Sequence, residues 1–468
     1  MIKATGVKGK KIAVLGLGRT GLATYHSLKE GEAEVLPWDE AEHSREFARK
    51  NNIKLVDITQ ESIWDESHIS RLIVSPGIPH LYPEPHPTVQ IAMNKGIPVD
   101  NDIGLFFQFL AHYKKSNFRK GFPKVVAVTG TNGKSTTAAL INHVLGSHGF
   151  VSAVAGNIGI AVLGLGDLED LTHIILEVSS YQLEVASLLH PDVAIFLNLD
   201  EDHLDRHHGL GGYFAAKRRL FGSDNIELAI VGIDEPEGMF LANSIISRGN
   251  GTRLARISND SSMKLPGLGV IGSNKQLTEF SSSKKIDSYT LAKNPSLMGN
   301  HNLQNASAAY LACCHLDVPG EKVIDYFNLF QGLPHRSQVV AIKSGVTYIN
   351  DSKATNVKST TKALESHARI HWIAGGLEKD GGVKPLKSSL SNVVQAYFFG
   401  YSAKTFALEL GHIPHSVFTT LPEAIGAASE NARPGDTVLL APAAASFDQY
   451  SDFEERGLHF INEVSQIK

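Results

Sequence analysis

Short apolar runs recur along the chain, and three of them lead into glycines or a turn and then into a helical pattern. They are KIAVLGLGRTGLATYHSL (residues 11–28), VVAVTGTNGKSTTAALINHVL (125–145) and ARIHWIAGGLEKD (368–380). Other runs, such as HIILEVSS, VAIFLNLD, AYFFGYS and TVLLAPA, are apolar nearly throughout, which is typical of parallel strands buried on both faces. Strands that alternate with helices in this way predict right-handed βαβ units and open α/β sheets.

The chain is long enough for about three such domains, since it has 468 residues. A polar, basic stretch at 112–124 separates the first unit from the second, and GLPHR at 332–336 precedes another strand-like run. We therefore expect domains at 1–114, 115–333 and 334–468. Residues 250–295 are rich in Ser, Lys and Gly, and they predict a β-rich or loop insertion.

Composition excludes several classes of protein. Apolar residues make up 42% of the chain and the formal net charge is −4, which argues against a protein that coats nucleic acid. The only two cysteines, Cys313 and Cys314, are neighbours and form no disulfide framework, so a reducing compartment, the cytoplasm, is expected. No run of about 20 apolar residues occurs, and we expect no membrane insertion.

The segment TGTNGKST resembles a phosphate-binding loop that is two residues short. Gly130, Gly133, Lys134 and Ser135 give G-x-x-G-K-S where the usual loop reads G-x-x-x-x-G-K-[ST]. Backbone N–H groups of such a loop and of the following helix cradle phosphate oxygens, the lysine reaches the β- and γ-phosphates, and a hydroxyl reaches Mg²⁺. A Gly-Lys turn without a ligand is the alternative.

Two further turns follow apolar strands near the N-terminus. GLGRTG at 16–21 has the spacing G-x-G-x-x-G, and Asp39 ends the next strand-like run, where a ribose-binding acid is expected. This pattern predicts a nucleotide or diphosphate site, or else a tight structural turn. SPGIP at 75–79 either lines the same crevice or is a plain turn.

Charged residues gather after two strands of the second domain. Glu177 ends the run HIILE, where a carboxylate beside a phosphate loop can hold Mg²⁺, and a solvated strand end is the alternative. NLDEDHLDRHHG at 198–209 crowds carboxylates and histidines at a strand exit, which suggests a metal and substrate site or a charged exposed turn. His203 would ligate a metal or cap a helix. On pattern alone Lys217, next to Arg218 and Arg219, belongs to a solvated basic face.

Polar clusters also follow later strands. Asn302 and Asn305 share one face of an Ala-rich helix, where they would hydrogen-bond a purine or ribose, or cap the helix. Arg336 in GLPHR is a candidate phosphate-binding cation. YINDSKATN ends a strand with Asp351 and Lys353, and LLAPAAASFDQY, 439–450, carries Ser446 beyond a late strand.

Taken together, these motifs resemble those of the Mur ligases, the ATP-dependent ligases of peptidoglycan synthesis. The resemblance rests on GTNGKST, LEVSSYQLE, NLDEDHLDRH followed by a helical lysine, GNHN, GLPHR, YINDSKATN and APAAASFDQY. The segment SFDQY…FEERG, together with NDSKATN, is most similar to the members that add D-glutamate. Folylpolyglutamate synthetases share the central ATP-binding design, but their other motifs fit less well.

The resemblance implies an α/β fold with three domains: an N-terminal Rossmann-like domain that binds the UDP substrate, a central P-loop-type ATPase domain with a mostly parallel sheet, and a C-terminal Rossmann-like domain that binds the amino acid. It implies that ATP phosphorylates the carboxylate of UDP-N-acetylmuramoyl-L-alanine and that the amine of D-glutamate attacks the resulting acyl phosphate. ATP and two Mg²⁺ ions are the implied cofactors. We expect a monomer.

The resemblance also implies roles for individual residues. The catalytic residues would be Lys134, His203 and Lys217, and the metal ligands Ser135, Glu177, His203 and Lys217, with Lys217 carried as a carbamate. ATP would be held by Gly130, Thr131, Asn132, Gly133, Lys134, Ser135, Thr136, Asn302, Arg336 and Asp351. The UDP substrate would be held by Arg19, Thr20, Asp39, Ser75 and Asn157. D-Glutamate would be held by Lys353, Thr355, Lys379, Ser446 and Phe447.

Other functions leave more of the sequence unexplained. A related ligase would add another amino acid or act on folate. A dinucleotide-dependent oxidoreductase built on GLGRTG accounts for residues 1–40 but gives no role to DEDH, NDSKATN or SFDQY. A non-catalytic nucleotide-binding protein is disfavoured because candidate metal, phosphate and acceptor groups occur together. After Asp39 the chain carries Glu40 and Ala41, where a cation would help to bind a diphosphate.

Overall fold

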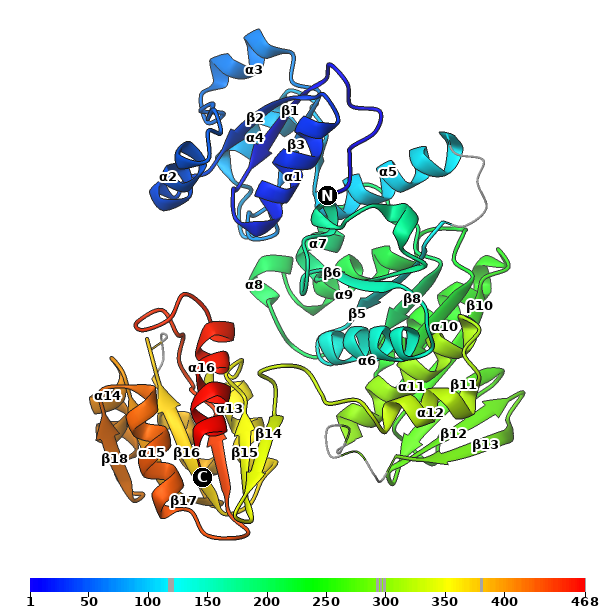
Figure 1. Cartoon of the computed structure of the whole chain (residues 1–468). Coiled ribbons are helices and arrows are strands. Elements are labelled where there is room, and N and C mark those ends of the chain that lie inside the picture. The colour runs from blue at the N-terminus through cyan, green and yellow to red at the C-terminus, as the bar shows by residue number, and fades with distance from the viewer. Residues whose placement is uncertain (117–121, 292–293, 295–296, 298–299, 379–381, 468) are drawn as a thin grey trace. The chain divides into compact units, whose positions relative to one another are not determined.

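Three sheets of mostly parallel strands organise the chain in the computed structural model (Figure 1). The structure describes residues 1–116, 122–291, 294, 297, 300–378 and 382–467. The first two sheets belong to one unit, Met1–Leu329, and the third to a second unit, Phe330–Lys468. The division of the first unit near residue 114 stays a prediction.

The first sheet has four parallel strands in the order β2-β1-β3-β4. They are β1 (Lys11–Leu15), β2 (Glu34–Trp38), β3 (Arg71–Val74) and β4 (Val99–Asp100). The helices of this part are α1 (Arg19–Glu30), α2 (Glu42–Lys50), α3 (Glu61–Ser67), α4 (Pro87–Asn94) and α5 (Asp102–Ser116). The central strand β1 is buried from Ile12 to Leu15, as its apolar run predicts.

The second sheet has nine strands among the described residues, in the order β13-β12-β11-β10-β9-β8-β5-β7-β6. They are β5 (Lys124–Thr129), β6 (Ser152–Gly156), β7 (His173–Glu177), β8 (Val193–Phe196), β9 (Leu228–Gly232), β10 (Arg253–Ser258), β11 (Leu268–Ser273), β12 (Gln276–Ser281) and β13 (Lys284–Thr290). The helices are α6 (Lys134–Ser147), α7 (Ser180–Val185), α8 (Leu204–His207), α9 (Leu210–Arg218), α10 (Pro236–Arg248), α11 (Asn300–His315) and α12 (Gly320–Phe327). Strand β5 lies between β7 and β8, so the segments that follow these three strands share one edge of the sheet.

The segment from β10 to β13, residues 253–290, is β-rich, one of the two predicted alternatives, but its strands are part of the main sheet. β10 and β11 continue the sheet in parallel, and β12 and β13 add an antiparallel hairpin at its end. Alternation is weak in the sequence because β13 lies at the edge of the sheet and has mostly exposed side chains.

The third sheet has the order β14-β15-β19-β16-β17-β18, and only β14 is antiparallel to its neighbour. Its strands are β14 (Gln338–Lys343), β15 (Val346–Asn350), β16 (Ile370–Gly375), β17 (Val393–Phe399), β18 (His415–Phe418) and β19 (Thr437–Leu440). Its helices are α13 (Val357–Glu365), α14 (Ala403–Leu410), α15 (Leu421–Asn431) and α16 (Phe453–Gln466). One apolar cluster includes Trp372 and Phe406, and another includes Tyr397 and Phe460.

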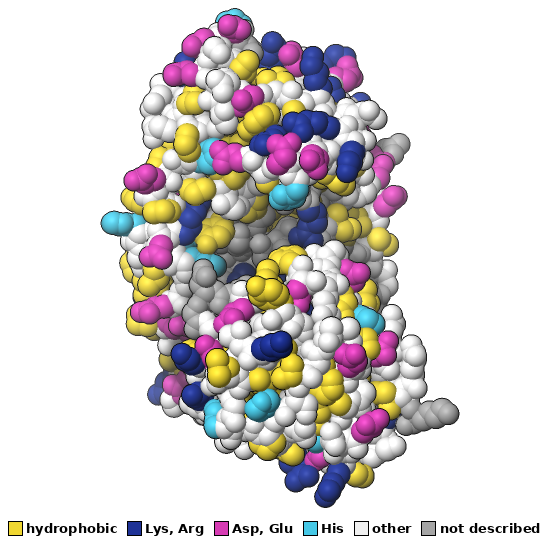
Figure 2. All heavy atoms as spheres, turned by 90° about the vertical axis from the view of Figure 1, so that its left-hand side faces the viewer, with side chains coloured by type: hydrophobic (Ala, Val, Ile, Leu, Met, Phe, Trp, Pro, Cys, Tyr) yellow, Lys and Arg dark blue, Asp and Glu magenta, His cyan; other side chains and the backbone are white. Residues whose placement is uncertain are grey.

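The surface charges, the cysteines and the hydrophobicity of the helices agree with the composition of the sequence. The face drawn in Figure 2 carries Lys, Arg, Asp and Glu side chains interspersed, as a net charge of −4 suggests. Cys313 and Cys314 are free thiols on α11. None of the described helices combines the length and the apolar character that a bilayer crossing requires.

Candidate active site

The loop between β5 and α6 has the left-handed backbone that its glycines allow. Gly133 has φ +83°, and a Cβ at this position would lie 2.0 Å from Oδ1 of Asn305. The Nζ atom of Lys134 lies 2.9 Å from the carbonyl oxygen of Gly130 and 2.8 Å from that of Thr131. The lysine therefore lies over its own loop, and helix α6 begins at this lysine with its first N–H groups at the loop.

A polar network fixes the underside of the loop. Asn198, at the end of the β8 segment, accepts a hydrogen bond from the N–H of Asn132 at 2.9 Å and donates to Gln304 at 2.7 Å. Asn305 donates to Asn302 at 3.2 Å, so the two asparagines share one face of α11, as their spacing predicts. Sequence reasoning did not single out Asn198 or Gln304, because their roles depend on strands and helices that meet only in the fold.

Glu177 ends β7 with a buried carboxylate, 2% exposed. Its Oε1 accepts a hydrogen bond from Nδ2 of Asn157 at 2.8 Å. Its Oε2 is buried and has no hydrogen-bond partner among the residues that the structure describes. The alternative of a solvated strand end is therefore wrong. A buried carboxylate oxygen without a donor is costly unless a cation or a donor completes it, so this position suits a metal ligand.

Lys217 is 1% exposed, which overturns the interpretation of a solvated basic face. Its Nζ donates to the carbonyl oxygen of Gly130 at 2.8 Å and lies 4.3 Å from the centre of the Tyr213 ring. Burial, together with the charge of Lys134, lowers the pKa of Lys217 to about 6, while Asp202 and Glu177 oppose this shift. This shift favours the neutral amine at neutral pH, next to the phosphate-binding loop.

The carboxylate-rich segment after β8 does not close into a metal cage by itself. Among the described residues, no three His, Cys, Asp or Glu side chains are placed to hold a metal ion together. The side chain of His203 is 47% exposed, lies 3.5 Å from Asp202 and packs near the Tyr181 ring. A metal role for His203 therefore needs ligands of other types, and it stays a prediction.

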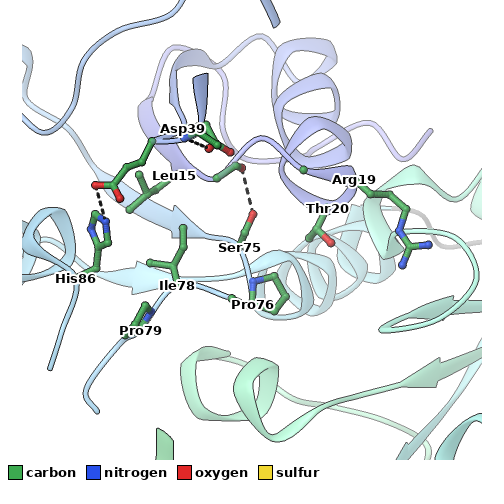
Figure 3. Close-up of a pocket in the computed structure, with 14 residues that line it drawn as sticks. Leu15, Arg19, Thr20, Asp39, Ser75, Pro76, Ile78, Pro79 and His86 are labelled. Atoms are coloured by element: carbon green, nitrogen blue, oxygen red, sulfur yellow. Dashed lines mark hydrogen bonds and ion pairs between the residues drawn. The ribbon is translucent and has the colours of Figure 1, made fainter. Parts of the chain in front are cut away.

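A pocket of about 570 Å³ lies at the carboxyl ends of β1, β2 and β3 (Figure 3). Its lining includes four of the five residues predicted for the UDP substrate, namely Arg19, Thr20, Asp39 and Ser75. SPGIP lines the same pocket, so of the two interpretations the shared crevice is confirmed and the plain turn is wrong. Asn157 is not part of this lining and instead contacts Glu177.

The Asp39 side chain stabilises the GLGRTG turn that lines this pocket. Its carboxylate accepts hydrogen bonds from the N–H groups of Leu17 at 2.5 Å and Ala41 at 2.8 Å. Figure 3 shows Arg19 pointing away from Asp39, while His86 meets Glu40 at 2.9 Å. The His86 ring therefore lies beside Glu40, at a position where a cation would help to bind a diphosphate.

Arg206 connects the pocket wall to the carboxylate-rich segment. It pairs with Glu184 at 2.6 Å and donates to the carbonyl oxygen of Ile78 at 3.3 Å, and both partners of the ion pair are nearly buried. The ring of Tyr82 stacks on that of His208 at 5.0 Å. These contacts hold the turn that follows β3 against α8.

In the second unit, Asp351 follows β15 and lies beside Ser337, whose hydroxyl donates to it at 3.3 Å. Burial raises the pKa of Asp351 to about 6, and Ser337 and Arg336 oppose this shift. Arg336 itself is exposed, and its predicted contact with a phosphate stays a prediction. Asn302, the third residue predicted for ATP outside the loop, belongs to the first unit.

The residues predicted for D-glutamate follow adjacent strands of the third sheet. Lys353 and Thr355 follow β15, and Ser446 and Phe447 follow β19. Ser446 is buried and Phe447 is 69% exposed. The Nζ of Lys353 lies 3.8 Å from the centre of the Phe453 ring. Lys379 lies outside the described residues.

Two family models match the chain. Residues 128–313 match the Mur ligase middle domain, and residues 335–444 match the glutamate ligase domain of Mur ligases. Two proteins named UDP-N-acetylmuramoylalanine--D-glutamate ligase are similar over their whole length. The one from Cereibacter sphaeroides is 48% identical over 467 residues, with 100% of both chains covered, and the one from Dinoroseobacter shibae is 49% identical over 468 residues, with the same coverage.

Solved structures agree on the fold. The UDP-N-acetylmuramate-alanine ligase of Thermotoga maritima has a TM-score of 0.57 at 17% identity, with 98% of this chain and 100% of that chain covered. A UDP-N-acetylmuramoyl-L-alanyl-D-glutamate--2,6-diaminopimelate ligase has a TM-score of 0.57 at 19% identity, with 81% and 90% covered. The predicted α/β architecture with mostly parallel sheets is confirmed.

Proposed function

Because the chain belongs to the Mur ligase family, we propose roles for its residues in the reaction that its relatives are named for. The protein is an ATP-dependent, amide-forming ligase that adds D-glutamate to UDP-N-acetylmuramoylalanine in peptidoglycan synthesis. The observation that carries the proposed roles is the meeting of Lys217, the phosphate-binding loop and the buried carboxylate of Glu177 at one sheet edge. Cytoplasmic location, a monomeric state and Rossmann-like outer domains are part of this proposal.

The phosphate-binding loop holds the β- and γ-phosphates of ATP. The N–H groups of 130–136 and the start of α6 supply donors, and Lys134 moves from its loop carbonyls to the phosphate oxygens. Asn302 contacts the base or ribose, and Arg336 and Asp351 are further proposed ligands of the nucleotide.

The residues beside the loop fit a divalent cation. Glu177 offers a buried oxygen that no group in the described part of the chain hydrogen-bonds, and Ser135 offers a hydroxyl at the start of α6. When bound, Mg²⁺ neutralises negative charge on the phosphate oxygens during transfer. We propose two such ions, with His203 near the second.

Lys217 reacts with CO₂ to form a carbamate. Its neutral amine nitrogen bonds to the carbon of CO₂ and releases one proton, which turns a buried amine into an anion. A pKa of about 6 leaves the amine unprotonated at neutral pH, and the nearby Lys134 ammonium attracts the resulting carbamate. The carbamate then offers hard oxygen ligands beside Glu177.

The acceptor carboxylate attacks the γ-phosphorus of ATP, and ADP leaves. The amine of D-glutamate then attacks the acyl phosphate carbon, and phosphate leaves to give the amide.

The pocket proposed for the uridine diphosphate is lined by Arg19, Thr20, Asp39 and Ser75. Asn157 contacts the muramoyl part near Glu177. D-Glutamate is bound by residues of the second unit, and its two carboxylates pair with the lysines among them. These residues are Lys353, Thr355, Lys379, Ser446 and Phe447.

A phosphate-release assay tests this function. Purified protein receives ATP, Mg²⁺, UDP-N-acetylmuramoyl-L-alanine and one amino acid at a time. We expect phosphate release with D-glutamate and not with L-glutamate, L-lysine or meso-diaminopimelate. Release with L-lysine or meso-diaminopimelate but not with D-glutamate would overturn the proposal.

A further inference from the structure

Arg456 is a completely buried arginine, 0% exposed, in the first turn of α16. Within the described residues no carboxylate forms a direct ion pair with it. Burial lowers its pKa to about 10, while the charge of Asp448 opposes this shift, so it stays charged. Burial of a cation without an ionic partner is costly, and such an arrangement is retained only where other groups satisfy its donors. The partners of Arg456 therefore indicate what it does.

Its guanidinium donates to three different segments. Nε donates to Oγ of Ser352 at 3.0 Å and Nη2 to the carbonyl oxygen of Ser352 at 2.9 Å. Nη1 donates to the carbonyl oxygens of Gly375 at 3.3 Å and Ala444 at 3.2 Å. A planar group with five N–H donors thus ties three backbone segments to one helix.

These three segments follow neighbouring strands of the third sheet. Ser352 follows β15, Gly375 ends β16 and Ala444 follows β19, which lies between the other two. The first segment leads into Lys353 and the third into Ser446, both proposed to contact D-glutamate. The second segment leads towards Lys379. Arg456 therefore contacts the three segments from which the chain continues to the residues proposed for D-glutamate.

Helix α16 also restrains the first segment through Phe453. The carbonyl oxygen of Phe453 accepts from the Ser352 hydroxyl at 2.8 Å, and its ring lies against the Lys353 ammonium. The middle segment is packed tightly as well, since a Cβ on Gly376 would lie 2.1 Å from the carbonyl oxygen of Ala445 and 3.1 Å from Nη1 of Arg456. A change at Arg456 is thus transmitted to all three segments.

We propose that Arg456 is a positioning residue for the amino-acid substrate: it holds the three segments in register and places a permanent positive charge behind them, which favours a dicarboxylic amino acid. The inference rests on the proposed function, because that function assigns D-glutamate to these segments. Arg456 does not itself contact the substrate and acts through Ser352, Gly375 and Ala444.

Steady-state kinetics of Arg456→Lys and Arg456→Met test the inference. In both variants the KM for D-glutamate should rise by roughly tenfold or more, with the larger rise in Arg456→Met, because charge-assisted hydrogen bonds to the loops are lost. The KM for the UDP substrate should change by less than about twofold, because its proposed pocket belongs to the first unit. Equal changes in the KM values for D-glutamate and the UDP substrate, or an unchanged KM for D-glutamate, would overturn it.

Two further variants keep the test decisive. Ser352→Ala removes the acceptor of Nε while Arg456 stays in place, and it should raise the KM for D-glutamate in the same direction, by less. It applies even if the arginine variants fail to fold, and an unchanged KM would then overturn the inference. Arg369→Met, which removes an exposed arginine paired with Asp436 at the amino end of the same sheet, is the matched control and should leave this KM unchanged.

Different experimental results would overturn the proposed function and the proposed role of Arg456. Lack of D-glutamate turnover by the wild-type enzyme would overturn the proposed function. The KM comparison would then be made with the amino acid that the wild-type enzyme does use. A selective rise in that KM would support the positioning role of Arg456, and its absence would overturn it.

Discussion

The Nζ atom of Lys217 lies 2.8 Å from the carbonyl oxygen of Gly130, so a buried lysine is in direct contact with the phosphate-binding loop. Helix α9 presents this lysine inward while its neighbour Arg218 is exposed. Because burial and Lys134 favour the neutral amine, the contact combines two requirements of carbamate formation, an unprotonated nitrogen and a nearby cation.

Replacement of Lys217 by alanine should lower kcat about 100-fold or more, since the carbamate anion proposed on this lysine, beside the reacting phosphate, is lost. Addition of acetate or formate should restore part of the activity by supplying a carboxylate in the vacated space. Arg218→Ala, on the same helix, should retain near wild-type kcat. Phosphate release measured with and without the acids checks this, and full activity of the unsupplemented Lys217→Ala enzyme would contradict it.

Glu177→Gln should raise the Mg²⁺ concentration needed for half-maximal activity by roughly tenfold or more, because the amide replaces a buried anionic oxygen. The variant should also lose most of the thermal stabilisation that MgATP gives the wild-type protein, which is read without turnover. Glu201→Gln, at an exposed carboxylate in the segment after β8, is the control. Equal Mg²⁺ dependence of all three proteins would exclude a metal role for Glu177.

Two glycines of GLGRTG should tolerate alanine very differently. A Cβ on Gly21 would lie 1.7 Å from the carbonyl oxygen of Gly16, whereas a Cβ on Gly18 meets no atom within 4 Å. Gly21→Ala should therefore cost about 2 kcal/mol or more of stability and raise the KM for the UDP substrate, since the turn must open. Gly18→Ala should keep its melting temperature. Thermal unfolding and substrate titration compare the pair, and equal stability would argue against the tight turn.

The sequence predicts those parts of the site that depend on local pattern. The glycine loop, the strand ending at Glu177 and the asparagine pair on α11 each follow from spacing within one element. The burial of Lys217 cannot be predicted in this way, because the sequence KRR offers three similar cations. Which of them faces inward depends on how α9 is rotated about its axis when it packs on the sheet.

Contacts between distant segments also cannot be predicted from the pattern of residues along the sequence. The bond from Asn157 to Glu177 needs β6 and β7 to pair with Gly156 opposite Glu177, and the partners of Arg456 come from three segments at least 12 positions away along the chain. The polar start of α16 gives no sign that one of its charged residues is buried. Such positions are found only when strand order is known.

Asp102 provides a pH test of the first unit, at the junction between the first sheet and α7. The preceding residue, Asn101, donates to the carbonyl oxygen of Gln182 at 2.7 Å, and Asp100 accepts the N–H of Ser187 at 3.0 Å. Asp102 itself is 1% exposed, and burial raises its pKa from 3.8 to about 6, while the Gln182 side chain opposes this shift.

A carboxyl group with a raised folded-state pKa favours folding only while it is protonated. Its contribution is complete below about pH 4 and is lost as the pH rises through 6, where the cost of the buried charge reaches about 3 kcal/mol. Asp102→Asn stays neutral at every pH, so its melting temperature should exceed that of the wild type by several degrees at pH 8 and by little at pH 4.5. Asp170→Asn, at an exposed site, should show no such change between the two pH values. A difference between Asp102→Asn and the wild type that is the same at both pH values would mean that the buried carboxyl does not titrate in this range.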